Sequence, residues 1–369
     1  MPGHIFEVHY DTLVESPESL ARALLASAWN RSMGERLRTA IRQHRPHLVS
    51  VQNFWFAVSP AVFGAAWSEG VPAVLTLRNY RLICPGALLM RANRPCEHCV
   101  GRSPWLAVAR RCYRGSALQT ALVARMVSSN RRRGTWGRMI SAYIALTEFS
   151  RSRFIAGGIP AERIHVKPNF LMEDPGVVAQ PGDGAVFVGR LSPEKGLEGL
   201  LDAWNAVPAP LSVVGEGPLR QWAMARSAGR PIRVLGQLRA ADVVASIKAV
   251  RLLVMPSIWY ECFPRVLLEA YACGRPVVAS RLGSMAEIVK DGETGLLFEP
   301  GNPADLAAKV RWLLDRPEEQ LRMGRNARAE FEARYTAERN YDQLMSIYQK
   351  AIAESESSHG RAVVLGGPR

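Results

Sequence analysis

Glu261 and Glu269 lie eight residues apart, on either side of the point where a helix is expected to begin. The stretch 251–280 alternates apolar runs with a loop and a Gly-Arg turn, which predicts a strand, a helix over 264–273 and a second strand. Pro264 suits the first helical position, where a missing N–H costs nothing. The helix N-terminus leaves unpaired N–H groups that favour an anion. Two carboxylates this close to an anion site suggest that each accepts hydrogen bonds from hydroxyl groups of a ligand. The alternative is that each is a solvated glutamate on the surface of a helix.

Two glycine turns follow other predicted strands and bring two cations with them. Gly189 allows a sharp turn, and Arg190 and Lys195 follow it, while Gly215 and Gly217 form a second turn of close approach. Ligands of a doubly wound sheet bind beyond the carboxyl ends of its strands, so these turns and the two glutamates are expected to share one crevice. Two cations and a helix terminus suit a diphosphate without a divalent metal, and two carboxylates suit ribose and sugar hydroxyls.

Strands and helices alternate through most of the chain, which predicts parallel sheets of the α/β class. A length of 369 residues predicts two domains of comparable size. We place the boundary in an acidic linker over 171–184 that contains Pro and Gly, between an N-terminal domain over 1–170 and a second domain over 185–335. The final helix is expected over 336–354, with a disordered tail over 355–369.

The periodicity of apolar residues predicts the individual elements. The expected strands are 48–51, 73–77, 144–146, 165–167, 186–188, 211–214, 232–235, 252–255, 277–279 and 296–298. The expected helices are 17–45, 59–69, 150–156, 197–204, one from 219 onward, 241–249, 264–273, 303–314, 318–335 and 336–354.

Four cysteines gather in a loop-rich stretch that interrupts this alternation, namely Cys84, Cys96, Cys99 and Cys112. A central CxxC is flanked by gaps of eleven and twelve residues. Four thiols in one segment could form a tetrahedral structural zinc site that closes the loop, with His98 as a spare ligand. Unligated or redox-active thiols are the alternative. We do not expect the segment to be catalytic in its own right.

The net charge of +14 is concentrated in one part of the chain. Residues 78–167 hold seventeen basic and three acidic side chains, an excess of fourteen, whereas the charges on either side of this stretch cancel. Within it, residues 104–138 interleave Trp, Leu, Val and Met with arginines. An aromatic and arginine-rich face suits a helix at an anionic membrane surface. The alternative is a helix that packs its apolar side chains on the core with solvated arginines; nucleic acid is less favoured, because no reader module accompanies the charge.

The composition also bears on where in the cell the protein is expected. No run of about 18 apolar residues predicts a membrane span, and the first residues lack the pattern of a signal peptide. Six cysteines in a chain of this length are too few for a disulfide scaffold, which fits a reducing cytoplasm.

The motifs GRLSPEKG, GEGP and ECFPRVLLEAYACGRPVVAS, followed by GSMAEIVKDGETGLLFEPGN, resemble the donor domain of retaining glycosyltransferase family 4. The resemblance covers residues 46–350 and is densest at 185–301. It implies the GT-B fold, with two Rossmann-like domains and a C-terminal helix that crosses back to the first. The glutamates of the family motif E-x7-E match Glu261 and Glu269, which implies contacts with the donor sugar and the ribose respectively.

The same resemblance implies that Arg190 and Lys195 hold the diphosphate of the donor. The donor site then also includes the glycines of the two turns and the residues between the glutamates, Cys262, Phe263 and Pro264. Retaining transfer of this type is thought to use the leaving phosphate as its own base, so no cofactor is required for catalysis.

The N-terminal half departs from the family pattern in two ways. Its opening strand and glycine-rich loop are not found, and a basic, cysteine-containing insertion occupies 78–138. Where relatives have a histidine, this chain has Arg78, which cannot act as a base at neutral pH but can stabilise phosphate charge.

The resulting prediction is a cytoplasmic retaining glycosyltransferase, peripheral at the inner membrane face. It would move a sugar from a nucleotide diphosphate sugar to a glycan or lipid-linked acceptor in bacterial envelope polysaccharide biosynthesis. The alternative is a catalytically impaired GT-B-like protein that binds nucleotide sugars without transfer.

Overall fold

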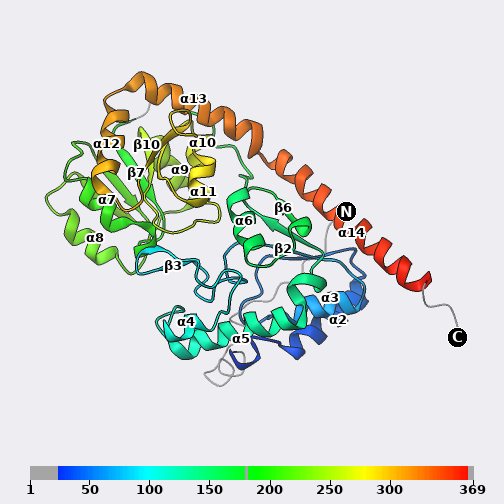
Figure 1. The fold of residues 1–369 in the computed structure, drawn as a ribbon. Coiled ribbons are helices and arrows are strands. Elements are labelled where there is room, and N and C mark those ends of the chain that lie inside the picture. The colour runs from blue at the N-terminus through cyan, green and yellow to red at the C-terminus, as the bar shows by residue number, and fades with distance from the viewer. Residues whose placement is uncertain (1–23, 179–181, 365–369) are drawn as a thin grey trace. The chain divides into compact units, whose positions relative to one another are not determined.

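The computed structural model describes residues 24–178 and 182–364, with side chains as far as residue 357. The chain forms two compact units, each described here by itself. The first unit comprises the chain up to Leu89, Glu97–Lys167 and the chain from Asp342 onward; the second comprises Met90–Cys96 and Pro168–Tyr341. The change of unit after Lys167 therefore precedes the predicted linker. Each unit contains a parallel sheet with helices (Figure 1), so the predicted α/β class is confirmed.

The sheet of the first unit has four parallel strands in the order β1-β2-β5-β6. They are β1 (Val49–Val51), β2 (Ala73–Thr76), β5 (Ala142–Ala145) and β6 (Ile164–Val166). Every residue of the two central strands is buried, as continuous apolar runs predict for a parallel sheet. The expectation of a missing opening strand concerns residues 1–23 as well, and these lie outside the described part of the chain.

The helices of the first unit are α2 (Arg31–His44), α3 (Ala61–Ser68), α4 (Leu106–Ala109), α5 (Ala117–Arg133), α6 (Glu148–Ala156) and most of α14 (Ala337–Val364). Short turns of other helix types occur at Thr135–Met139 and Ala161–Arg163. Along α14, Ile347 and Ala351 pack with Val74 and Ile144 of the sheet. The Tyr348 hydroxyl is 2.7 Å from Oγ of Ser50, the middle residue of β1.

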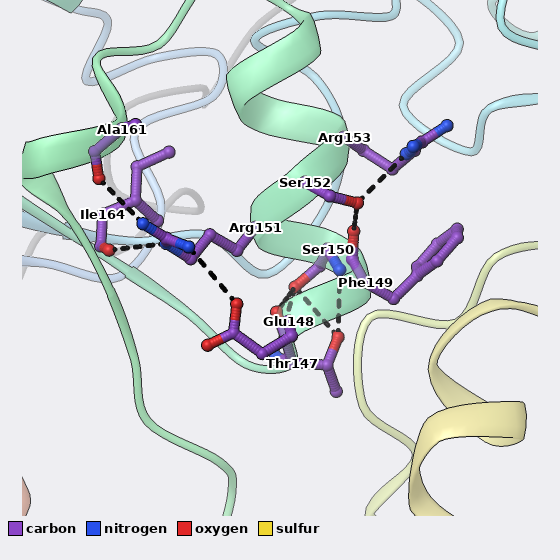
Figure 2. A network of polar contacts seen from close by, with 9 residues as sticks. All are labelled: Thr147, Glu148, Phe149, Ser150, Arg151, Ser152, Arg153, Ala161 and Ile164. Atoms are coloured by element: carbon purple, nitrogen blue, oxygen red, sulfur yellow. Dashed lines mark hydrogen bonds and ion pairs between the residues drawn. The ribbon is translucent and has the colours of Figure 1, made fainter.

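A polar network fixes α6, the helix that connects β5 to β6 along the chain (Figure 2). Thr147 caps the helix by accepting a hydrogen bond from the Ser150 N–H at 3.1 Å, and the Ser150 hydroxyl faces back to Thr147. Arg151 donates to the carbonyl of Ile164 at 3.0 Å and to that of Ala161 at 3.3 Å. Because Ile164 begins β6, this one guanidinium ties the helix to the start of the next strand.

The sheet of the second unit has six parallel strands in the order β12-β11-β10-β7-β8-β9. They are β7 (Ala185–Val188), β8 (Leu211–Val214), β9 (Ile232–Gly236), β10 (Leu252–Met255), β11 (Val277–Ser280) and β12 (Gly295–Phe298). The chain builds outward from β7 to β9 and then returns to place β10 on the other side of β7. The strand order therefore reverses between β7 and β10, the point at which doubly wound sheets bind ligands.

The helices of the second unit are α7 (Leu197–Ala203), α8 (Arg220–Ser227), α9 (Ala240–Lys248), α10 (Arg265–Ala272), α11 (Gly283–Ile288), α12 (Pro303–Leu314) and α13 (Pro317–Arg334). A 3-10 turn occupies Pro193–Lys195, and the hairpin of β3 (Met90–Arg91) and β4 (Arg94–Pro95) also clusters with this unit. Apolar side chains of β7, β8 and β10 form one core with those of α7 and α12.

Several sequence expectations are corrected by these elements. The helix expected over 17–45 is interrupted before α2, where Asn30 is the N-cap; its residues 17–23 lie outside the described part. Pro264 is the N-cap of α10 rather than its first helical residue. The basic stretch 104–138 forms two α-helices, α4 and α5, rather than one, and α11 was not predicted. Residues 355–364, expected as a disordered tail, continue α14, whereas 365–369 are not described.

Candidate active site

The loops that follow β7 and β10 lie against each other at the point where the strand order reverses. The Ile258 N–H donates to the Glu194 carbonyl at 3.0 Å. Gly196 has φ of +71°, and a Cβ there would lie 1.9 Å from the carbonyl oxygen of Pro256. This position therefore accepts only glycine, both for its left-handed backbone and for the closeness of the second loop. The contact places the side chains of the two loops within reach of each other.

Lys195 and Glu261 form an ion pair across these two loops. Lys195 Nζ is 2.6 Å from Glu261 Oε1, and the Ser257 hydroxyl donates to the same oxygen at 2.7 Å. Glu261 is only 5% exposed, so its carboxylate needs both partners to offset the loss of water. The described residues place no hydrogen-bond donor on Oε2, which leaves that oxygen for a hydroxyl of a ligand. The structure thus brings together two residues that the sequence predicted as a site.

Trp259 lies beside Lys195 and has a polar atom without a partner among the described residues. The Lys195 ammonium lies 5.5 Å from the centroid of the Trp259 ring. The indole Nε1 of Trp259 is buried and has no hydrogen-bond partner among the described residues. A buried donor without a protein acceptor is costly, so this N–H is available to a ligand or to a water. The sequence patterns did not predict Ser257 as a site residue, and its one signal is its place two residues after a buried strand.

The turn after β8 lies on the turn after β7. The Gly189 N–H donates to the Val214 carbonyl at 3.0 Å, and the Leu191 N–H donates to that of Glu216 at 2.8 Å. A Cβ at Gly215 would lie 1.9 Å from the Gly189 carbonyl oxygen, and one at Gly217 would lie 2.4 Å from that of Leu191. The two predicted glycine turns therefore form one layer at the carboxyl edge of the sheet.

The side chain of Arg190, next to these two turns, is exposed. It follows Gly189 directly, and no hydrogen bond or ion pair occupies its guanidinium within the described residues. An exposed guanidinium beside a glycine turn is available to an anion, in the bidentate geometry that phosphate oxygens accept.

Glu269 lies in the second turn of α10, where its side chain is 17% exposed and 3.2 Å from Arg265 Nε. Burial raises the pKa of Glu269, and the charge of Arg265 opposes that change. Among the residues between the two glutamates, Cys262, Phe263 and Pro264 are buried. The Asn169 amide donates to the Phe263 carbonyl at 3.2 Å and holds this loop. Cys262 and Phe263 thus shape the loop that carries Glu261.

Arg78 belongs to the first unit, in the loop that follows β2. Its side chain is exposed, and its Nε donates to Gln52 Oε1 at 3.1 Å. Lys167, just after β6, has its pKa lowered to about 8 by burial and by the charge of Arg78. The carboxyl edge of this sheet is therefore cationic.

The cysteines of the insertion are all half-buried. Cys84 and Cys112 both flank Gly86: a Cβ there would lie 3.7 Å from Cys84 Sγ and from Cys112 Cβ. Within residues 24–178 and 182–357, no group of three or more His, Cys, Asp or Glu side chains is placed to hold a metal ion. A structural zinc at these cysteines stays a prediction.

Solved structures with the same fold are glycosyltransferases. HepE from Anabaena in complex with UDP has a TM-score of 0.62, with 24% identity over 88% of this chain and 82% of that chain. Sucrose-phosphate synthase from Thermosynechococcus elongatus has a TM-score of 0.65, with 17% identity over 95% of this chain and 82% of that chain. The fold is GT-B, with two Rossmann-like domains, as the sequence resemblance implied.

The sequence of the second unit matches that of a known protein family. Residues 180–330 match the sequence model of the family described as glycosyl transferases group 1. D-rhamnosyltransferase WbpZ from Pseudomonas aeruginosa is 36% identical over 157 residues, which cover 41% of this chain and 41% of that protein. D-inositol 3-phosphate glycosyltransferase from Corynebacterium glutamicum is 34% identical over 193 residues, 47% of this chain and 46% of that protein. The chain spans less than half the length of these relatives, and the match to the glycosyl transferases group 1 lies in its second unit.

Proposed function

We propose that this protein is a retaining glycosyltransferase that moves a sugar from a nucleotide diphosphate sugar to a glycan or lipid-linked acceptor. The observation that carries the proposal is the Lys195–Glu261 pair, held at 2.6 Å where the strand order of the second unit reverses. A cation beside a buried carboxylate offers one group for a diphosphate and one for sugar hydroxyls. The names of the relatives agree with sugar transfer.

Each residue has a role that follows from its chemistry. Arg190 and Lys195 neutralise the charge that develops on the leaving diphosphate, the electrostatic effect that contributes most to such reactions. Glu261 accepts hydrogen bonds from hydroxyls of the donor sugar, and Glu269 accepts them from the ribose. In the retaining route the leaving phosphate takes the proton of the acceptor hydroxyl, so Arg78 need not act as a base. Bacterial envelope polysaccharide is the proposed product.

Titration with a nucleotide sugar tests the donor site. HepE has been solved in complex with UDP-glucose, which makes this compound the first donor to try. We expect binding by the unmodified protein, and binding about 10- to 100-fold weaker for Glu269→Gln, because a hydrogen bond to a charged acceptor is lost. Affinity should also fall as the pH drops through the raised pKa of Glu269, since the protonated carboxyl loses acceptor strength, and Glu269→Gln should abolish that dependence.

Glu332→Gln is the matched control for this titration, because Glu332 also pairs with an arginine four residues before it on a helix. Equal affinities in both variants would contradict the role of Glu269. Transfer is then followed with a panel of acceptors, and retention of the anomeric configuration is read by NMR. Binding of nucleotide sugars without hydrolysis or transfer would favour the alternative, a GT-B-like binding protein without activity.

We also propose that the first unit associates with an anionic membrane at the cytoplasmic face. Trp105, Leu106 and Leu118 of the neighbouring helices α4 and α5 are 49%, 44% and 73% exposed. Arg114 and Arg125 lie exposed in the same stretch, whereas the opposite side of α5 buries apolar side chains in the core. Core packing therefore accounts for the buried side of α5 but not for the exposed apolar and basic side chains on its other side. No helix in the described residues is both long and apolar enough to cross a bilayer.

Liposome binding tests this membrane proposal. Association with vesicles that contain phosphatidylglycerol should weaken steeply with salt, because each arginine near the surface contributes about 1 kcal/mol that salt screens. Combined Trp105→Ser and Leu118→Ser substitutions should reduce binding further. The control is Trp67→Ser, since Trp67 on α3 is 57% exposed outside the basic stretch. Binding that is absent, or that does not change with salt, would leave only the core-packing role.

A further inference from the structure

Arg81 is half-buried, and two of its three guanidinium nitrogens have no acceptor among the described residues. Its Nε and Nη1 atoms are buried and have no hydrogen-bond partner within the described residues. The residue lies in the loop that follows β2, at the carboxyl edge of the sheet of the first unit. Its own N–H donates to Asn79 Oδ1 at 3.0 Å, which fixes the turn and the direction in which the side chain leaves it. A guanidinium held in this way is positioned but not neutralised.

Two aromatic rings hold the guanidinium in place. Its Cζ lies 5.0 Å from the centroid of the Trp55 ring and 5.1 Å from that of Tyr113. The two rings are nearly perpendicular, and Trp55 Nε1 donates to the Tyr113 hydroxyl at 3.2 Å. Ring faces attract the cation, but they do not accept the in-plane N–H groups of a guanidinium as an oxyanion does. Burial lowers the pKa of Arg81, opposed by Tyr113 and Cys84, and an arginine stays charged at neutral pH.

Arg81 lines a small pocket at this edge of the sheet. The wall is built from the loop after β1 and from the end of β2 with the loop after it. None of the eleven lining residues is acidic, and Arg78 brings a second guanidinium to the same wall. Gln52 accepts from Arg78 at 3.1 Å and donates to Ser50 Oγ at 3.4 Å, so it adds no charge to the wall. Among the described residues, the pocket is thus lined by two guanidinium groups without an acidic side chain.

We propose that this pocket binds an oxyanion of the acceptor substrate, a phosphate or a carboxylate, through Arg81. The oxyanion would accept hydrogen bonds from Nε and one terminal nitrogen, the bidentate geometry that arginine offers to both groups. This inference rests on the proposed function, because it treats the first unit as the acceptor side of a glycosyltransferase. The acceptor would then be an anionic molecule, although the donor site by itself is compatible with a neutral acceptor.

The test uses the full chain with UDP present in excess, so that the proposed donor site is filled. Inorganic phosphate and glucuronate are titrated separately by calorimetry, which distinguishes the two sources of the oxyanion. We expect one of them to bind, with affinity about 10- to 100-fold lower in Arg81→Gln. Arg81→Lys should recover only part of the affinity, because an ammonium is a point charge without the planar fork. Arg132→Gln, at an exposed position of α5, should bind as the unmodified protein does.

The Tm of thermal unfolding is a second measurement, which shows whether Arg81→Gln loses affinity because it folds less well. Without added anion, Arg81→Gln should be at least as stable as the unmodified protein, because a buried cation without acceptors is removed. The anion that binds should raise the Tm of the unmodified protein and leave that of the variant unchanged. Binding of neither anion, or equal binding by Arg81→Gln, would overturn the proposal.

The donor titration separates this failure from failure of the proposed function. If UDP-glucose binds and neither anion does, the glycosyltransferase proposal stands and the acceptor inference falls. If Arg81→Gln weakens UDP-glucose as much as it weakens the anion, the pocket belongs to the donor site and the acceptor is not defined by it.

Discussion

Replacing Lys195 by methionine is expected to lower the rate of sugar transfer by about 100- to 1000-fold, the usual effect of removing one charge-stabilising group from an active site. Methionine keeps much of the length of the side chain and removes the charge that lies 2.6 Å from Glu261. The loss should appear mainly in kcat, because the charge on the leaving diphosphate is greatest in the transition state. Steady-state kinetics with varied donor concentration measure it.

Lys290→Met is the matched control for this prediction. Lys290 also pairs with a glutamate, Glu330, at 2.8 Å, but it precedes β12 and therefore lies at the amino edge of the same sheet. This variant should retain the rate of transfer. A similar loss of rate in both variants would indicate a general effect on the second unit and would contradict a role for Lys195 in the reaction.

Stability separates the role of Lys195 in the fold from its role in catalysis. Lys195→Met leaves the buried Glu261 carboxylate without its cation, so the variant should be less stable than the unmodified protein. Adding Glu261→Gln removes the unpaired charge and should restore much of that stability, whereas transfer should stay low. Recovery of the rate in the double variant would show that Lys195 acts only as a partner of Glu261.

Gly196→Ala is expected to destabilise the protein by about 2–5 kcal/mol, the sum of a left-handed backbone for alanine and a forced overlap. The added Cβ would lie 1.9 Å from the Pro256 carbonyl oxygen, so the loops after β7 and β10 must separate. The same movement would displace Lys195 from Glu261 and weaken donor binding. Urea unfolding and donor titration of the one variant measure both effects.

Gly229→Ala isolates the backbone part of this effect. Gly229 has φ of +73°, nearly that of Gly196, but nothing lies within 4 Å of an added Cβ. It should cost only about 1–2 kcal/mol and leave donor binding unchanged. If the two alanine variants were equally stable, the close approach of the loops would not be what positions the Lys195–Glu261 pair.

Local sequence predicts a helix or strand well when neighbouring residues show both where the element begins and which of its side chains are buried. The bounds of α12 are those expected, because Asn302 caps the helix by accepting from the Asp305 N–H and Pro303 occupies its first turn. The strands β10 and β11 were expected because each is a short run of apolar residues buried on both faces. In contrast, α11 has six residues and no apolar period long enough to reveal it.

Distant contacts decide the elements that the periodicity misplaced. The helical pattern continues through Asn30, yet the helix begins anew after it. The Asn30 N–H donates to Ser59 Oγ at 2.7 Å, and its side chain donates to the Ala57 carbonyl at 2.8 Å. These partners lie 29 and 27 residues away, so a window of a dozen residues contains no sign of them.

The order of residues along the chain predicts glycine turns with Arg190 and Lys195 after one strand, and Glu261 after another. That Lys195 and Glu261, 66 residues apart, form a pair, and that Ser257 completes it, depends on the tertiary fold. The cause is the order of the strands in the sheet. Spacing along the chain is the same whether β10 lies beside β7 or beside β9, and only the pairing of the sheet places these two loops together.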